Sequence, residues 1–304
     1  MTPDLTTRLG RLTLPNPILT ASGTFGYARS MARLGDLSRL GGIVPKTITV
    51  APRSGNQPPR TVETTAGLLN AIGLDNDGLD EFIEKKMPYL ASLGAPILVS
   101  IAAKKIEECA VFAERLDPLA HISALELNVS CPNVSGGVDF GTNPGLCEKM
   151  VAELRHKTRF PVAVKLSPNV TNIAEMAKAA EAGGADMITA INTLYGLSVD
   201  WRNRRPRIAN GYAGYSGPAI KPVALRCVSQ IYRAVKIPII GVGGISSLSD
   251  VMEFIVAGAS AVEIGTANFF HPRLVFELID ELPKLMEREK IGALFELVGT
   301  LDFT

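Results

Sequence analysis

The sequence lacks several of the patterns that reveal function most directly. It contains neither GxGxxG nor GxxxxGK(S/T), so it predicts neither a Rossmann dinucleotide site nor a P-loop. Its four cysteines, Cys109, Cys131, Cys147 and Cys227, include no CxxC pair, which argues against a zinc site, an iron–sulfur cluster and a secreted disulfide framework. We therefore expect no metal site in this chain and a reducing, cytoplasmic location.

Net charge and long apolar runs are also scarce. The formal net charge is +1, and no stretch approaches the roughly 18 apolar residues of a membrane-spanning helix. The opening MTPDLTTRLGRLTLPNPI is polar and interrupted by proline, unlike a signal peptide or an amphipathic presequence. We expect neither nucleic acid nor a membrane as partner, which leaves small molecules and proteins.

What the sequence does contain is a repeating pattern of apolar runs, with hydrophobic residues making up 46% of the chain. Amphipathic stretches, such as residues 172–182 and 221–235, separate most of these runs and predict helices. Glycines in LGGIV, AGGADM and AGASAV precede three of the runs, and we expect them to be left-handed residues that end helices. Eight runs predict strands: PILTAS, GIVPKT, PILVSI, ALELNV, PVAVKL, MITAIN, PIIGVG and AVEIGT.

Eight such units in one chain predict an α/β fold, a single (β/α)8 TIM barrel spanning residues 1–304. Two ordinary domains would also suit the length, but no Ser/Gly/Pro-rich linker divides the chain. Residues 6–17 predict a small hairpin that closes the bottom of the barrel. Residues 194–217, after the sixth strand, form a long polar insertion that carries the single tryptophan, Trp201, and we expect a lid or an interface there.

Polar and glycine residues cluster where the predicted strands end, and in a barrel those ends form the active face. Lys46 and Lys165 are costly to bury there unless they meet an anion or an electron-rich ligand, although a solvated rim would also accommodate them. GVGGI from Gly241 and GT from Gly265 follow the seventh and eighth strands, where many barrels bind phosphate on backbone N–H groups. A mononucleotide such as FMN fits this pattern better than NAD.

The stretch NVSCPN places Cys131 between a serine and a proline. This cysteine could be packing filler, a metal ligand, half of a disulfide or a working thiol, and an isolated free cysteine is most often an inert core residue. Cys109, Cys147 and Cys227 lie in stretches that read as helices, and we interpret them as structural.

Taken together, these motifs resemble the dihydroorotate dehydrogenase family over nearly the whole chain. The shared motifs occur in the family's order and spacing: TASGTFG from Thr20, PKTIT from Pro45, GLLNAIGLDN from Gly67, LNVSCPN from Leu127, VKLSPNV from Val164, INT from Ile191, SGPAIKP from Ser216 and GVGGI. The resemblance implies a barrel that binds FMN at the strand ends and oxidises dihydroorotate to orotate in pyrimidine synthesis. It also implies that Cys131 is the catalytic base of the soluble class 1, whereas the membrane-associated class uses serine.

The resemblance implies roles for further residues. Cys131 would take the C5 proton of dihydroorotate while the C6 hydride goes to FMN, and a thiol with an ordinary pKa near 8.5 suits that task when cations or hydrogen bonds lower its pKa. Lys165 would lie near flavin N1 and O2. The implied substrate-binding residues are Lys46, Asn70, Ile72, Gly73, Leu74, Asn128, Asn133, Asn192 and Thr193. The implied cofactor-binding residues are Ser22, Lys46, Thr47, Ser100, Asn128, Lys165, Ile191, Gly217, Gly243, Gly244, Gly265 and Thr266.

Two positions depart from the family pattern. Many relatives carry Asn where this chain has Ser100, which removes a possible amide contact to the flavin. They also carry GGLSG where this chain has AGYSG from Ala213, and we expect Tyr215 to crowd the loop on the flavin side.

The electron acceptor can also be predicted from the resemblance. We expect no N-terminal membrane-associated helical region, which argues against quinone as the direct acceptor and leaves NAD⁺ or fumarate. APRSGNQPPRTVET from Ala51 and GTANFF from Gly265 are similar to the NAD-linked subclass B. Because this chain carries no Rossmann fingerprint and no clustered cysteines, we expect a homodimer flanked by two copies of a partner that carries FAD and a 2Fe–2S cluster, a heterotetramer.

Three alternatives remain open at this point. The first is a fumarate-linked homodimeric dihydroorotate dehydrogenase. The second is a flavin barrel like that of dihydropyrimidine dehydrogenase, although Lys46 with Asn70 suits a substrate carboxylate that dihydropyrimidines lack. The third is a non-catalytic flavin-binding scaffold, against which the cysteine of NVSCPN argues.

Overall fold

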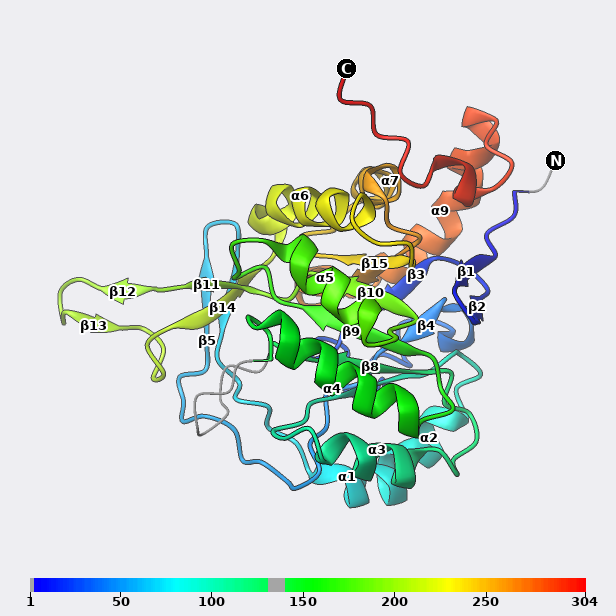
Figure 1. Ribbon diagram of the computed structural model, residues 1–304. Helices are drawn as coiled ribbons and strands as arrows, with labels where there is room; N and C mark the ends of the chain where they lie inside the picture. The colour runs from blue at the N-terminus through cyan, green and yellow to red at the C-terminus, as the bar shows by residue number, and fades with distance from the viewer. Residues whose placement is uncertain (1–2, 131–139) are drawn as a thin grey trace.

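A closed ring of parallel strands forms the centre of the computed structural model, which describes residues 3–130 and 140–304 (Figure 1). Bridges from Ile43 to Ile97 and from Ile48 to Ile101 join the two edge strands of the eight-stranded sheet. The strands, in spatial order, are β4 (Gly42–Ile43), β3 (Ile18–Thr20), β16 (Ala261–Ile264), β15 (Ile239–Val242), β10 (Met187–Ala190), β9 (Val162–Leu166), β8 (Ala124–Asn128) and β7 (Leu98–Ile101). Each lies within one of the eight predicted runs, so the predicted barrel is confirmed.

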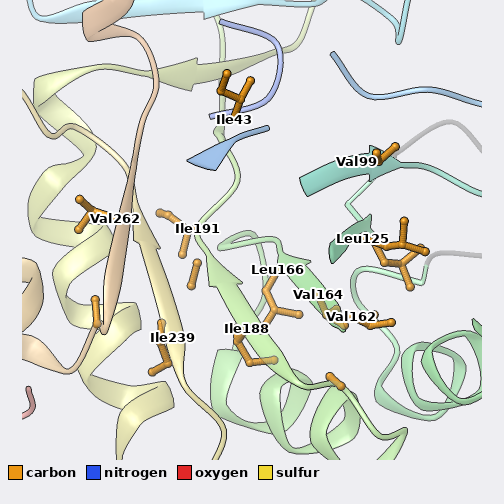
Figure 2. Close-up of a cluster of buried hydrophobic side chains, with 14 of the residues drawn as sticks. Ile43, Val99, Leu125, Val162, Val164, Leu166, Ile188, Ile191, Ile239 and Val262 are labelled. Carbon is orange, nitrogen blue, oxygen red and sulfur yellow. The ribbon is translucent and has the colours of Figure 1, made fainter. Parts of the chain in front are cut away.

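Side chains alternate between the two faces of the barrel sheet, as the twofold period of a strand requires. On the outer face, Leu125, Val164 and Ile188 from β8, β9 and β10 belong to the large core beneath the helices (Figure 2). A second core fills the barrel interior at the end where the strands begin. Its inward-facing residues are Leu19, Val44, Leu98, Ala124, Ala163, Met187, Ile240 and Ala261. The near-continuous apolar character of the strands therefore reflects burial on both faces.

An N-terminal hairpin closes that end of the barrel. Strands β1 (Thr7–Leu9) and β2 (Leu12–Leu14) pair antiparallel, with Leu9 opposite Leu12. Leu9, Leu12 and Leu14 are buried and join the inner core. The predicted hairpin at the bottom of the barrel is thus confirmed.

Helices surround the barrel and connect most of its strands (Figure 1). Asn143, Asn172 and Ser247 cap α4, α5 and α7 by accepting a backbone N–H hydrogen bond from the first turn. The α-helices are α1 (Gly78–Glu81), α2 (Met87–Ala91), α3 (Glu108–Leu116), α4 (Pro144–Lys157), α5 (Ile173–Ala182), α6 (Lys221–Tyr232), α7 (Leu248–Ala257), α8 (Ala267–Phe270) and α9 (Leu274–Glu289). A π-helix, η2 (Phe82–Lys86), separates α1 from α2, and short 3₁₀ helices are η1 (Leu37–Arg39), η3 (Pro218–Ile220) and η4 (Leu294–Leu297).

Two of the three predicted helix-ending glycines adopt positive φ, Gly184 at 90° and Gly258 at 124°. The prediction was wrong for LGGIV, because neither Gly41 nor Gly42 has positive φ. Glycine is needed at position 41 for a different reason. A Cβ atom there would lie 2.2 Å from the carbonyl oxygen of Asn16, so the backbone approaches too closely for any side chain.

The insertion after the sixth barrel strand contributes to a second sheet at the end of the barrel opposite the hairpin (Figure 1). Its strands β11 (Leu194–Gly196) and β14 (Ala213–Ser216) join β6 (Gly67–Asn70) and β5 (Thr61–Thr64) in the antiparallel order β11-β14-β6-β5. A further hairpin, β12 (Val199–Asp200) and β13 (Arg205–Pro206), extends away from the barrel, with Trp201 72% exposed. Within residues 3–130 and 140–304, no helix is long and apolar enough to cross a membrane.

Candidate active site

A cavity of about 450 Å³ opens at the carboxyl ends of the barrel strands and is bordered by residues of the second sheet. Of the predicted site residues that the structure describes, all but Ser100 line it. They are Ser22, Lys46, Thr47, Asn70, Ile72, Gly73, Leu74, Asn128, Lys165, Ile191, Asn192, Thr193, Gly217, Gly243, Gly244, Gly265 and Thr266. Residues that are up to 244 positions apart in the chain are therefore brought to one site.

Two predicted residues, Cys131 and Asn133, lie outside the described residues. Ser100 is described but does not line the cavity. Its side chain is fully buried inside the barrel, and its Oγ lies 2.9 Å from Oγ1 of Thr47, which does line the cavity. Ser100 is thus placed to support Thr47 rather than to face a ligand.

Tyr215 does not crowd the cavity, contrary to the expectation from AGYSG. Neighbouring Gly214 and Ser216 line the cavity, whereas Tyr215 does not. Because side chains alternate along β14, the Tyr215 ring lies on the other face, where it packs with Leu69 and its hydroxyl lies 3.3 Å from Thr64 Oγ1. The departure at this position therefore leaves the cavity open.

Three carboxamides form a hydrogen-bonding wall of the cavity. Asn192 Nδ2 donates to Asn128 Oδ1 over 3.4 Å, and Asn192 Oδ1 accepts from the backbone N–H of Thr193 over 2.8 Å. Asn70, at the end of β6, donates to the carbonyl of Gly214 over 3.3 Å. All three are half-buried, so each retains donor or acceptor capacity toward the cavity, as the binding of a ring with N–H and C=O groups requires.

Lys46 follows β4 and supplies a cation to the same cavity. Burial lowers the pKa of the Lys46 ammonium below its usual value, and the carboxylate of Asp75 acts in the opposite direction. A buried cation of this kind gains most from an anionic ligand, because the ligand compensates the lost hydration.

Glycines form the opposite wall of the cavity, after β15 and β16. Gly243 and Gly244 have φ of 133° and 80°, which only glycine adopts readily. A Cβ atom on Gly244 would lie 2.8 Å from the backbone nitrogen of Lys221. This cradle of bare backbone beside the start of α6 suits a phosphate group, and its position after strands seven and eight is where barrels bind phosphate.

Beneath the cavity, inside the barrel, lies a group of three ionisable residues, Glu126, Lys165 and Glu263. Lys165 Nζ donates to Glu263 Oε2 over 2.8 Å and lies 3.6 Å from Glu126 Oε2. Both glutamates are fully buried, and the Lys165 side chain is 6% exposed. Burial acts to lower the pKa of Lys165, but the two carboxylates together raise it above its usual value, so the lysine is charged.

Sequence reasoning missed several residues of this site. Glu126 and Glu263 each place a carboxylate in the middle of an apolar run, ALELNV and AVEIGT, and this signal was available. Asn169 lines the cavity, donates to the carbonyl of Thr193 and accepts from the N–H of Tyr195, each over 2.9 Å, so it fixes the start of the insertion. Arg53 and Asn56 also line the cavity, and no strand-end pattern marks them.

The remaining three cysteines lie away from the cavity. Cys109, Cys147 and Cys227 are buried in α3, α4 and α6. Burial raises the pKa of Cys109 and of Cys147 to about 12 and also raises that of Cys227. Protonated and enclosed, they are packing residues, which confirms their structural interpretation.

Comparison with known proteins agrees with the family resemblance of the sequence motifs. The family model described as dihydroorotate dehydrogenase matches residues 4–286. Three similar proteins bear the name dihydroorotate dehydrogenase B (NAD(+)), catalytic subunit. The one from Trichlorobacter lovleyi is 48% identical over 99% of this chain and 100% of its own length. Those from Geobacter sulfurreducens and Maridesulfovibrio salexigens are 47% and 49% identical, over 99% and 98% of both chains respectively.

Proposed function

This chain belongs to the dihydroorotate dehydrogenase family, and on that premise we propose that it oxidises dihydroorotate to orotate with FMN as its cofactor. The observation that carries this proposal is the cavity itself. One wall presents three carboxamides and Lys46, which suit a planar amide ring that bears a carboxylate, and the other presents the glycine cradle, which suits a phosphate.

The roles of the residues follow from their chemistry. Asn70, Asn128 and Asn192 bind and orient the ring, and Lys46 pairs with the substrate carboxylate. Cys131 accepts the C5 proton as the thiolate. When bound, FMN supplies the acceptor for the C6 hydride. Lys165 holds a positive charge below the cavity, where it stabilises negative charge that develops on the cofactor.

The position of Cys131 in the sequence supports its role as the base. Ser130 lines the cavity, and its backbone N–H donates to Asn128 Oδ1 over 3.1 Å. Cys131 is the next residue in the sequence after Ser130.

We further propose that electrons leave through a second polypeptide that carries FAD and a 2Fe–2S cluster and passes them to NAD⁺. The similar proteins are named as NAD(+)-linked catalytic subunits, and they match this chain along nearly its full length. Phe269 and Phe270 line the cavity and are 56% and 58% exposed, so the rim offers an apolar surface near the proposed cofactor. We place the partner at this rim and expect two copies of each chain in the assembly.

Substrate-dependent bleaching of the bound flavin tests the proposed reaction. The purified chain, kept anaerobic, should lose its visible flavin absorbance with dihydroorotate but not with dihydrouracil, which lacks the carboxylate that Lys46 would bind. Equal bleaching by both compounds would favour a dihydropyrimidine dehydrogenase-like activity. Bleaching by neither, with flavin bound, would favour a non-catalytic scaffold.

A further inference from the structure

Two buried glutamates share one lysine below the cavity, and the proposed reaction leaves the glutamates without a role. Glu126 comes from β8, Lys165 from β9 and Glu263 from β16, so three strands contribute one charged residue each to the barrel interior. The residues that face these three from the neighbouring strands are uncharged. Ser100 and Ala163 lie opposite Glu126, Asn128 and Thr189 opposite Lys165, and Leu19 and Val242 opposite Glu263.

Hydrogen bonding within the group is incomplete if both glutamates are ionised. Oε1 and Oε2 of Glu126 and Oε1 of Glu263 are buried without a donor among the described residues. Two carboxylates beside one cation would also leave a net negative charge in the barrel, which is unfavourable in a buried environment. A proton held between the two carboxyl groups cancels the excess charge and supplies one donor, which engages one oxygen of each carboxyl group.

The direction in which the pKa of Glu263 is shifted agrees with this geometry. Burial raises its pKa well above the usual range, the nearby Glu126 raises it further, and Lys165 acts in the opposite direction. One carboxyl of the pair therefore keeps its proton at neutral pH.

We propose that Glu126, Lys165 and Glu263 form a charge-neutral triad that holds one shared proton, and that the two glutamates are positioning residues that set how strongly Lys165 stabilises negative charge on the cofactor. This role rests on the proposed function, because it requires a flavin above Lys165. The shared proton itself does not, since it depends only on the three side chains.

The shared proton is tested by infrared spectroscopy of the purified chain at neutral pH, with the flavin removed. A protonated-carboxyl band should be present in the wild type and in a control variant, Thr189→Val, which changes an uncharged neighbour of Lys165. The band should disappear in both Glu126→Gln and Glu263→Gln, because the remaining carboxylate then pairs alone with Lys165. Absence of the band from the wild type, or its persistence in both single variants, would overturn the proposal.

The influence on the cofactor is tested by the midpoint potential of the bound flavin at mildly acidic pH, where an unpaired lysine keeps its proton. In each single Gln variant the remaining carboxylate still cancels the charge of Lys165. The flavin of such a variant should therefore be reduced about as readily as in the wild type. The double variant Glu126→Gln/Glu263→Gln leaves Lys165 uncompensated and should favour reduced flavin at least tenfold, about 30 mV for two electrons.

A potential of the double variant that matches that of Thr189→Val would contradict the positioning role. If the double variant fails to fold, the single variants decide the charge balance, and a shift of tenfold or more in both contradicts the charge-neutral triad. If the chain binds no flavin at all, the proposed function fails while the infrared result still decides the shared proton.

Discussion

At the scale of single residues, the proposed reaction depends on the thiol of Cys131. Cys109, Cys147 and Cys227 are buried in helices and protonated, whereas Cys131 directly follows Ser130 at the cavity wall. Only a thiol that can ionise serves as a base near neutral pH.

Replacing that thiol should separate chemistry from binding. We expect Cys131→Ala to keep its yellow flavin and to bind orotate, yet to reduce the flavin with dihydroorotate roughly 10²- to 10⁴-fold more slowly, the usual contribution of a general base. Stopped-flow absorbance measures this rate. Cys147→Ala is the matched control and should reduce at the wild-type rate. The wild-type rate should rise with pH as the thiol ionises, and unchanged kinetics in Cys131→Ala would exclude it from the mechanism.

A second prediction concerns Lys46 and the pH dependence of the affinity for orotate. Burial lowers the pKa of Lys46, so its charge is lost at a lower pH than that of an exposed lysine, whose usual pKa is 10.5. Affinity for orotate should therefore fall as the solution becomes alkaline. Titration of the flavin absorbance with orotate across this range measures the effect.

The control for this prediction keeps the charge at every pH. Lys46→Arg remains protonated throughout, so its orotate affinity should change less with pH than that of the wild type. Lys46→Met should bind orotate roughly tenfold or more weakly at neutral pH, because a charged hydrogen bond contributes about 1.5–3 kcal/mol. Identical pH profiles for wild type and Lys46→Arg would assign the alkaline loss to another group.

Single residues also mark a limit of sequence reasoning. The strand-end rule located Asn128, Asn192, the two lysines and the glycines after β15 and β16, since each follows a recognisable apolar run. Asn70 was predicted from the family resemblance alone. The comparison with the family pattern led to the wrong expectation for Tyr215, because the facing of a short strand such as β14 is set by its register with β6, and this register is not encoded locally. The strand-end rule overlooked Glu126 and Glu263, whose burial depends on a lysine from a third strand.

At the scale of elements, the barrel was predictable and the second sheet was not. Each barrel strand lies in a compact apolar run, and most are followed by an amphipathic helix, so the signal is local. Strand β6 pairs with β14, and the bond from Asn70 to Gly214 spans 144 residues, so no local pattern reveals it. The insertion was recognised as a feature, but its strands depend on this distant partner.

The glycine cradle gives a prediction at this scale. Gly265 is the cleaner position to test, because its φ is not positive and a Cβ atom there would meet only Ala21 Cβ, at 3.6 Å. Gly265→Val should fold but be purified largely colourless, since its side chain obstructs the approach of a phosphate to the backbone. Absorbance per polypeptide and thermal melting measure the two effects.

Two comparisons sharpen that test. Gly145→Ala, at an exposed position of α4 away from the cavity, should retain full flavin. Substitutions to valine at Gly243 or Gly244 should also lose flavin, but their positive φ adds strain and lowers stability as well. Full flavin occupancy in Gly265→Val, Gly243→Val and Gly244→Val together would mean that the phosphate lies elsewhere.

At the scale of the whole molecule, the chain has a site for oxidising dihydroorotate but offers no fingerprint for NAD⁺ in its sequence. Its similar proteins are named as catalytic subunits, and the cavity rim exposes Phe269 and Phe270. The central claim is therefore that this chain performs the first half-reaction and that a partner completes the second.

The formation of NADH with and without the partner tests this claim most directly. Purified chain mixed anaerobically with excess dihydroorotate and NAD⁺ should produce about one orotate per bound flavin and no sustained NADH. Addition of the FAD and 2Fe–2S partner should start continuous NADH formation. Sustained NADH formation by the isolated chain would contradict the account, and rapid turnover with fumarate alone would assign the chain to the fumarate-linked enzymes.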